Sequence, residues 1–223
     1  MNIEIKSISK KYGKKSVLKD ISLKAQSGEC IGILGANGCG KSTLLSILAG
    51  VVRPSGGEFS ADGENLFDSK RRLAELVGFV PQGTPLIEEL TAFDNLSLWY
   101  DRKTLKSSLK SGMLKTLGID EFIKVPVSKM SGGMKKRLSI GCAVYKNQPI
   151  LLLDEPTAAL DIICKQEISS YLKERKEKGD IIFLATHDIS ELQLCDKLYI
   201  IKEGELQPFL FEGDAEKLMG SIK

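Results

Sequence analysis

No apolar run in this sequence is long enough to cross a membrane. The longest runs, ILLL at residues 150–153 and IIFLA at residues 181–185, fall far short of the roughly 20 residues that a spanning helix needs. The N-terminal residues alternate apolar and polar side chains, so they lack the continuous apolar core of a secretory signal peptide. We therefore expect a protein of the cytosol.

Histidine and paired cysteines are also scarce. The chain has one histidine, and no two of its cysteines form a CxxC pair, so neither a zinc site nor a disulfide framework is indicated. We expect reduced, mostly buried thiols at the five cysteines, which are Cys30, Cys39, Cys142, Cys164 and Cys195.

An excess of charge of one sign is missing as well. The 32 basic and 29 acidic residues give a formal charge of +3, which is too small to indicate nucleic-acid binding by bulk electrostatics. Two local basic runs, at residues 10–15 and 135–137, are predicted to be solvated faces rather than binding patches.

What the sequence does contain is an alternation of strands and helices over 223 residues. Apolar side chains occupy every second position at residues 3–5 and 21–25, as in half-buried strands. Farther along, apolar strands at residues 31–34, 150–153 and 181–186 each precede a predicted helix. In the first of these helices, the apolar residues from Leu44 onward have the spacing of a buried helix. This order favours an α/β fold with a mainly parallel sheet covered on both faces.

The residue pattern changes between residues 85 and 145, where leucines and lysines occur at helical spacing. We interpret this segment as a helical lobe inserted into the α/β core. The prediction is one unit over residues 1–223, with a core formed by residues 1–84 and 146–223 and a helical part formed by residues 85–145.

A glycine-rich loop joins the strand at residues 31–34 to the following helix. Its sequence, GANGCGKS at residues 35–42, matches GxxxxGK[ST], in which backbone N–H groups wrap the phosphates of a nucleotide. The helix aims the positive end of its dipole at the same anion. Lys41 can reach the β and γ phosphates, and the Ser42 hydroxyl is a ligand for Mg²⁺.

Two acidic residues, Asp154 and Glu155, follow the apolar strand at residues 150–153. Groups just past the ends of parallel strands line the ligand crevice. We therefore predict that Asp154 holds Mg²⁺ through water and that Glu155 orients or deprotonates the attacking water. The alternative is that the pair only favours a helix start, as Pro156 and Thr157 also would. The phosphate loop elsewhere in the chain favours the catalytic interpretation.

The one histidine, His187, follows another buried strand and should lie at the same sheet edge as Glu155. A lone histidine is more often structural than catalytic, but this placement favours catalysis. A neutral imidazole there can hydrogen-bond a γ-phosphate oxygen and hold the attacking water in register with Glu155.

One further loop distinguishes among the families that have a phosphate loop. The segment MSGGM at residues 130–134 precedes a basic helix and then the Asp154-Glu155 strand. It resembles the signature loop of ATP-binding cassette (ABC) proteins, whose usual form is Leu-Ser-Gly-Gly-Gln. Standing alone it could be an ordinary Ser-Gly-Gly turn, although such a loop at a helix N-terminus also presents donors to an anion.

Other positions match the same family. Tyr12 resembles the aromatic residue that stacks on adenine, Gln82 the glutamine that senses Mg²⁺ and the membrane partner, and Ala159-Leu160-Asp161 the loop that crosses to the other subunit. Taken alone, Tyr12 could be a half-exposed strand aromatic. The resemblance, over about residues 3–202, implies the ABC ATPase fold: a phosphate-loop core, an N-terminal antiparallel β subdomain and an inserted helical subdomain.

The resemblance assigns a set of residues to the nucleotide and its metal. Ser42, Gln82 and Asp154 are expected at the metal, and Lys41 is expected to act in catalysis with Glu155 and His187. The residues expected to bind nucleotide are Tyr12, Val17, Gly35, Asn37, Gly38, Cys39, Gly40, Lys41, Ser42, Thr43, Gln82 and Asp154.

The resemblance also implies a mechanism that needs two cassettes. The phosphate loop of one faces the signature loop of the other, so that Ser131, Gly132, Gly133 and Met134 contact ATP in trans while Asp161 lies in the crossing loop. Hydrolysis removes the anion that held the halves together. The helical lobe moves with the signature loop, with Gln82 as its hinge.

The cofactors and partners implied by the resemblance are ATP, Mg²⁺ and other protein chains. We expect a homodimer or heterodimer with a second ABC cassette. We also expect separate transmembrane transporter subunits, which hold the protein at the inner face of the cell membrane.

The sequence departs from the family pattern at two positions. Met134 stands where glutamine is usual, which removes an amide that helps to position the loop, but Ser131 and the backbone donors are expected to keep the site active. Cys39 occupies a phosphate-loop position where small residues are common. Either a thiol simply fits there, or its place at a helix N-terminus makes it sensitive to oxidation and alkylation.

Two other functions fit the sequence less well. ABC ATPases that serve nucleic acid usually carry tandem cassettes or long coiled-coil insertions, which this sequence lacks, so no nucleic-acid partner is expected. A silent cassette that only binds nucleotide would not need Lys41, Asp154, Glu155 and His187 together. The cargo and the direction of transport stay open, since the run MKKRLSI resembles exporter-type cassettes only weakly.

Overall fold

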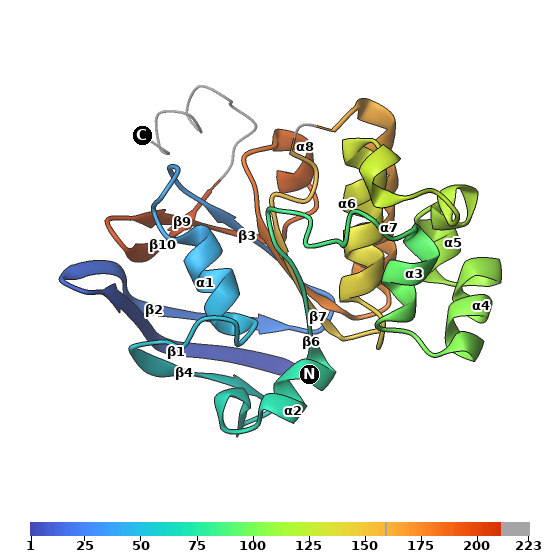
Figure 1. Cartoon of the computed structure of the whole chain (residues 1–223). Helices are drawn as coiled ribbons and strands as arrows, with labels where there is room; N and C mark the ends of the chain where they lie inside the picture. Colours follow the sequence, from blue (N-terminus) through green and yellow to red (C-terminus); the bar gives the residue numbers. More distant parts are fainter. Residues whose placement is uncertain (159, 211–223) are drawn as a thin grey trace.

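The computed structural model describes residues 1–158 and 160–210. The chain forms two β-sheets with helices packed around them (Figure 1). The strands are β1 (Asn2–Tyr12), β2 (Lys15–Gln26), β3 (Cys30–Leu34), β4 (Gly56–Ala61), β5 (Glu64–Asn65), β6 (Val77–Val80), β7 (Ile150–Asp154), β8 (Ile181–Ala185), β9 (Lys197–Lys202) and β10 (Glu205–Phe209).

The α-helices are α1 (Lys41–Leu48), α2 (Lys70–Leu76), α3 (Ala92–Ser97), α4 (Arg102–Ser111), α5 (Met113–Thr116), α6 (Gly132–Ala143), α7 (Ile162–Glu177) and α8 (Ile189–Leu192). Short 3₁₀ helices are η1 (Leu66–Asp68), η2 (Ile119–Phe122) and η3 (Val127–Lys129). No helix within the described residues is both long enough and apolar enough to span a membrane.

The smaller sheet is antiparallel, with the strand order β2-β1-β4-β5. Its inward side chains recur at every second residue, and Ile3, Ile5 and Ile21 are almost fully buried. This alternation is the pattern expected of strands that face a core on one side. The predicted N-terminal antiparallel β part is therefore confirmed.

The larger sheet has the strand order β10-β9-β3-β8-β7-β6. All of its neighbouring strands are parallel except β10, which pairs antiparallel with β9. Every residue of β3, β7 and β8 is buried, as expected for parallel strands covered on both faces. The prediction of a mainly parallel sheet is confirmed, whereas β10 was not predicted.

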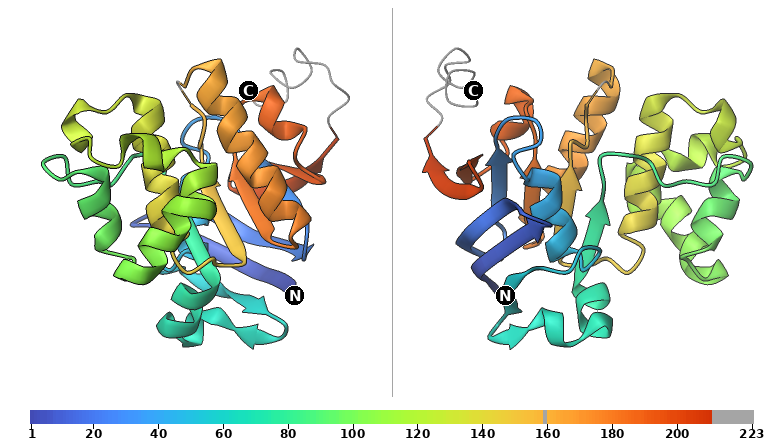
Figure 2. Two further views of the ribbon diagram at one scale, coloured as in Figure 1. Left: turned by 90° about the vertical axis from the view of Figure 1, so that its right-hand side faces the viewer. Right: turned by 60° about the vertical axis from the view of Figure 1, so that its left-hand side comes forward.

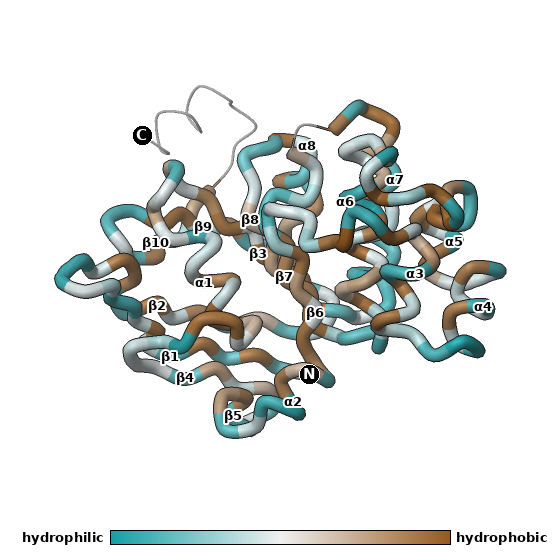
Figure 3. The backbone as a smooth tube through the Cα atoms, viewed as in Figure 1, coloured by the Kyte–Doolittle hydropathy of each residue, from teal (hydrophilic) through white to brown (hydrophobic). Residues whose placement is uncertain are grey.

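Apolar cores lie on the two faces of the larger sheet. On one face, α1 lies between the two sheets (Figure 1) and contributes Leu44, Leu45 and Leu48 to a core shared with β1 and β2. On the other face, α6 and α7 cover the sheet through side chains such as Leu138 and Ile168. Figure 3 shows the hydrophobic residues concentrated along the central strands, with hydrophilic loops outside.

The segment predicted as helical contains α3 to α6, which gather on one side of the molecule while β9 and β10 lie on the other (Figure 2). Local signals start these helices. Thr91 and Asp94 form a capping box at α3, and the Asp101 carboxylate caps α4 by accepting from the N–H groups of Lys103 and Thr104. The helical character of the segment is as predicted, and its division from the core at residues 85 and 145 stays a prediction.

The prediction for the basic runs was right at one place and wrong at the other. Residues 10–15 are mostly exposed. In the second run only Lys135 reaches the surface, because α6 is enclosed on most sides and Lys136 and Arg137 are 4% and 9% exposed. Arg137 pairs with Glu167 at 2.8 Å. Lys136 therefore belongs to the interior, not to a solvated face.

Candidate active site

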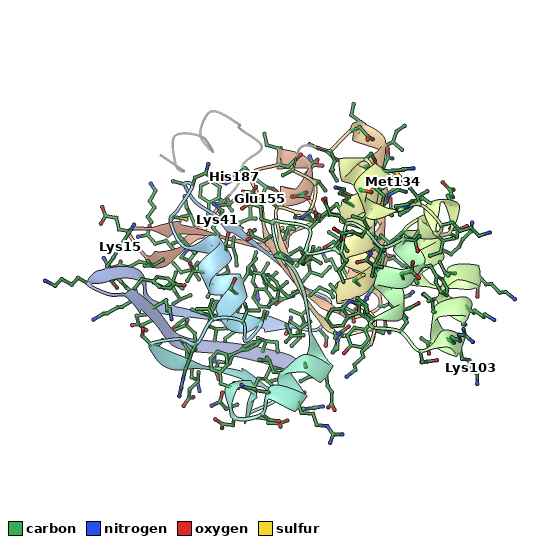
Figure 4. All side chains as sticks on the ribbon, viewed as in Figure 1. Lys15, Lys41, Lys103, Met134, Glu155 and His187 are labelled. Carbon is green, nitrogen blue, oxygen red and sulfur yellow. The ribbon has the colours of Figure 1, made fainter. Side chains whose placement is uncertain are left out.

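The predicted site residues follow the carboxyl ends of four adjacent parallel strands. The phosphate loop follows β3, His187 follows β8, Asp154 ends β7, and Gln82 follows β6. Because parallel neighbours end at the same edge of a sheet, these residues converge. A cavity of about 370 Å³ lies at this edge, and Asp154 is not part of its lining. The lining residues are Asn37, Gly38, Gly40, Lys41, Ser42, Thr43, Gln82, Glu155 and His187. Figure 4 shows Lys41, Glu155 and His187 close together above α1.

The phosphate loop is a tight turn that leads into α1. Gly40 caps the helix with φ of +119°, and a Cβ at this position would lie 2.7 Å from the Leu18 side chain. Only glycine combines that conformation with that contact. The helix begins at Lys41, earlier than the apolar spacing from Leu44 indicated, because its first turn is the polar end of the loop.

Lys41 is buried and folds back over the loop. Its Nζ donates to the Gly35 carbonyl at 2.7 Å and to the Ala36 carbonyl at 3.3 Å. A cation held at the mouth of a loop of backbone N–H groups is a suitable site for a polyphosphate. Cys39 is half-buried within this loop and packs against the core as a free thiol.

Glu155 is held by its backbone and by the Gln82 side chain, and His187 lies close to it. Its φ is +47°, an unfavourable conformation for a residue other than glycine, and its N–H donates to the Ala185 carbonyl at 2.8 Å. The Gln82 Nε2 donates to one carboxylate oxygen at 2.9 Å, and the His187 Nε2 lies 3.6 Å from the other. Strain of this kind is typical of functional positions, and here it turns the carboxylate towards Gln82 and His187.

Burial and nearby charges shift the pKa values of two groups in the site, Asp154 and His187. Burial raises the pKa of Asp154, while the Ser42 hydroxyl and the Lys41 ammonium favour its charged form. Partial burial and the Lys41 charge lower the pKa of His187 from its ordinary value, although Glu155 opposes this shift. This shift favours the neutral imidazole, which can donate one ring N–H to a phosphate oxygen.

The oxygen atoms near the phosphate loop fit Mg²⁺. The Ser42 hydroxyl lies close to the Asp154 carboxylate. The Gln82 side chain donates its amide N–H to Glu155, which leaves the amide oxygen of Gln82 as the atom that could reach a metal. Among residues 1–158 and 160–210, no group of three or more His, Cys, Asp or Glu is placed to hold a metal. Such a sparse oxygen set suits Mg²⁺, which keeps several waters and takes phosphate oxygens as ligands.

Two residues that are expected to bind nucleotide, Tyr12 and Val17, are not part of the lining of this cavity. Val17 borders the phosphate loop, since a Cβ at Gly40 would lie 3.3 Å from its Cγ1. Tyr12 ends β1, is 50% exposed, and has the Lys10 ammonium 4.9 Å from its ring centroid. A tyrosine ring with this much exposed surface could stack on a base.

The signature loop lies apart from the phosphate loop of the same chain, as the separation of Met134 from Lys41 in Figure 4 shows. The Ser131 hydroxyl caps α6 by accepting from the Met134 N–H at 3.2 Å. A Cβ at Gly133 would lie 2.4 Å from the Cys164 Sγ, so the starts of α6 and α7 are in close contact. Asp161 caps α7 by accepting from the Cys164 N–H at 2.9 Å. Ala159 of the crossing loop lies outside the described residues.

Sequence reasoning missed Lys136, which the structure joins to the site. Its Nζ donates to the carbonyls of Pro81 and Gln82, each at 3.1 Å. No local signal identifies it, because Lys136 stands between Lys135 and Arg137 in a basic run that indicates a solvated face.

Comparisons with known proteins identify the family of this chain. The family model described as "ABC transporter" matches residues 18–158. A linearmycin resistance ATP-binding protein of Bacillus subtilis is 33% identical over 209 residues, which cover 92% of this chain and 67% of that protein. A Nod factor export ATP-binding protein of Sinorhizobium fredii is 35% identical over 91% of this chain and 60% of its own length. A sulfate/thiosulfate import ATP-binding protein of Bacillus cereus is also 35% identical, over 92% of this chain and 60% of its own length.

Solved structures lead to the same family. A dimeric ATP-binding cassette in a post-hydrolysis state, bound to ADP and Pi, aligns with a TM-score of 0.81 at 29% identity, over 95% of this chain and all of that one. The predicted ABC ATPase fold is thus confirmed. The chain belongs to the ABC transporter family, as the ATP-hydrolysing cassette of a transport system.

Proposed function

We propose that this cassette closes with a second cassette over two ATP molecules and drives transport by separate transmembrane chains. The supporting observation is that the phosphate-loop part of the site and the signature loop are far apart within one chain. Lys41, Gln82, Glu155 and His187 line or border one cavity, while the Met134 end of the signature loop lies well away from it in the same chain (Figure 4). A complete site therefore needs the signature loop of another cassette.

The chain's own residues divide the work of hydrolysis. Lys41 exchanges the carbonyls of Gly35 and Ala36 for the β and γ phosphates. Glu155, oriented by Gln82, accepts a proton from the attacking water. His187, neutral at pH 7, hydrogen-bonds the γ-phosphate. Mg²⁺, held by Ser42 and Asp154 with Gln82 nearby, would neutralise charge on the phosphate oxygens.

The second cassette completes the site with its signature loop. Ser131, Gly132 and Gly133 of one cassette contact the γ-phosphate held by the other, and Asp161 lies where the two cross. The similar solved cassette is dimeric, which supports this arrangement. Either a second copy of this chain or a related cassette would serve.

The transmembrane chains would place the cassette at the inner face of the cell membrane. Transport of some kind is supported by relatives named as resistance, export and import ATP-binding proteins. Since the export and import relatives are equally similar to this chain, the proposal does not include a direction or a cargo.

Glu155→Gln tests the catalytic assignment. The variant should bind ATP normally but hydrolyse it about 100-fold or more slowly, because the general base is lost. It should therefore accumulate as an ATP-bound dimer in size-exclusion chromatography with light scattering. Lys41→Met, which should not bind ATP, is the control that stays monomeric. Hydrolysis by Glu155→Gln at the wild-type rate would refute the assignment.

Mixing two inactive chains tests the shared site. Lys41→Met removes the phosphate-loop cation, and Ser131→Arg blocks the signature loop. A mixed dimer has one site in which both lesions meet and one intact site. Equal mixing should restore about a quarter of the wild-type activity for a self-associating chain, since half of the dimers are mixed. If activity stays at the level of the separate variants, the signature loop does not act in trans.

A further inference from the structure

We propose that Lys136 is a positioning residue that couples the signature loop to the water-activating carboxylate of the same chain. The coupling runs from α6 through the ammonium of Lys136 to the backbone at Gln82, and from the Gln82 side chain to Glu155. This inference rests on the roles proposed above for Gln82 and Glu155.

Lys136 is buried and directed at the segment after β6. Its side chain is 4% exposed, and its Nζ donates to the carbonyls of Pro81 and Gln82 at 3.1 Å each. The neighbouring lysine is different, since the Lys135 Nζ pairs with Glu88 at 3.0 Å near the surface. Within the described residues no carboxylate oxygen lies within 4.0 Å of the Lys136 Nζ, so its close partners are the two backbone carbonyls.

A lysine at such a position is unfavourable unless its donors are used. An ammonium is strongly destabilised by removal from water, and an apolar side chain would fill the same space without that penalty. Burial lowers the pKa of Lys136, while the nearby acids Asp154, Glu155 and Glu191 oppose this shift. The three acids thus stabilise the charged form of Lys136, and its hydrogen bonds hold the carbonyls of Pro81 and Gln82 in place.

The bonds of Lys136 continue into the active site. Gln82 accepts from Lys136 with its carbonyl and donates from its side-chain Nε2 to Glu155 at 2.9 Å. One residue therefore holds both the ammonium and the carboxylate. A displacement of the Gln82 backbone changes the position from which its amide orients Glu155.

At its other end, Lys136 is fixed to the signature loop by a helix. Ser131 caps α6, and its carbonyl accepts from the Lys135 N–H at 3.0 Å, so residues 131–136 form a continuous helical start. Five residues of helix span about 7.5 Å along the axis. When Ser131 moves to meet a nucleotide on another cassette, Lys136 must move with it. Contact of the signature loop with that nucleotide then changes the position of the Glu155 carboxylate in the same chain as the loop.

The first measurement compares three variants by steady-state ATP hydrolysis. Lys136→Met keeps the length of the side chain and removes its donors, Lys136→Gln keeps an N–H donor without the charge, and Lys135→Met is the matched control on the same helix. We expect Lys136→Met to lower kcat about 10- to 100-fold, as small misplacements of catalytic groups do, with KM for ATP unchanged within about 2-fold. Lys136→Gln should recover most of the loss, and Lys135→Met should match the wild type.

Some outcomes of that comparison overturn the proposal. An unchanged kcat in Lys136→Met shows that the contact is not used. An equal loss in Lys136→Met and Lys136→Gln shows that the charge matters and the hydrogen bonds do not. A rise in KM at constant kcat assigns the residue to nucleotide binding instead.

The second measurement is a double-mutant cycle with Gln82→Ala. If Lys136 acts through Gln82, Lys136→Met should lower kcat in the wild-type background and have no further effect in Gln82→Ala. Additive losses refute the coupling. Glu155→Gln in the same assay distinguishes a failure of the proposed function from a failure of the role proposed for Lys136. Activity retained there contradicts the proposed function, whereas its loss together with an active Lys136→Met contradicts only the role of Lys136.

Discussion

Arg175 holds the amino ends of the catalytic strands together, and its removal should destabilise the protein strongly. The guanidinium is 4% exposed near the end of α7. It pairs with Asp180, just before β8, and donates to the Gln148 carbonyl, just before β7, at 2.6 Å. It also donates to the Tyr171 hydroxyl at 2.8 Å.

The size of the effect follows from what Arg175→Met leaves behind. Methionine fills much of the space but leaves the mostly buried Asp180 carboxylate without its cation and the Gln148 carbonyl without its donor. Breaking a buried ion pair in this way costs about 3–5 kcal/mol. For a chain of this size that loss lowers Tm by about 6–20 °C. The double variant Arg175→Met/Asp180→Asn should recover part of the loss, because an uncharged amide replaces the unpaired carboxylate.

The assay is thermal and urea unfolding followed by circular dichroism. Arg71→Met is the control, because Arg71 pairs with Glu75 at 3.0 Å on the surface and is 90% exposed, so no measurable loss is expected. ATP affinity well below Tm should be unchanged in Arg175→Met, since Arg175 lies at the strand ends opposite the site. A Tm for Arg175→Met within about 2 °C of the wild type would refute the reasoning.

Three further predictions concern the site and its surroundings. Gly133→Ser should destabilise the protein by about 1–3 kcal/mol in urea unfolding, because the new Cβ meets Cys164; a stability equal to the wild type contradicts the close contact. Because burial lowers the pKa of His187, kcat/KM for ATP should hold steady as pH falls to 6.5 and decline only below it; a decline that starts above pH 7 contradicts a neutral imidazole. Tyr12→Ala should weaken binding of a fluorescent ATP analogue about 10-fold while Tyr12→Phe binds normally, if the exposed ring stacks on adenine.

The parts of the fold that could be predicted are those in which local pattern and tertiary role agree. The apolar runs of β3, β7 and β8 indicate parallel strands because such strands are buried on both faces. Strand β10 escaped prediction, since its sequence ELQPF is short and contains Pro208, a residue that occurs in sheets mainly at edges. Its pairing with β9 is decided by tertiary contact rather than by its own residues.

The same distinction applies to the site. The placement of Gln82, Asp154 and His187 at one edge was predictable because each lies at or just past the end of a strand and the strands are parallel. Lys136 was not, because a lysine in a basic run is normally solvated. Its burial depends on elements from elsewhere in the chain packing around α6, and no local pattern reports that. The pairing of site residues between two chains lies beyond any single sequence pattern.

The left-handed backbone of Glu155 also bears on how this protein could be made more heat-resistant. Glycine at this position would relax the φ of +47° and remove the carboxylate in the same step. Thermal resistance and turnover therefore favour opposite residues at this one position. A search for heat-resistant variants that does not also screen for hydrolysis should enrich inactive chains altered here, as expected where a strained conformation is retained for function.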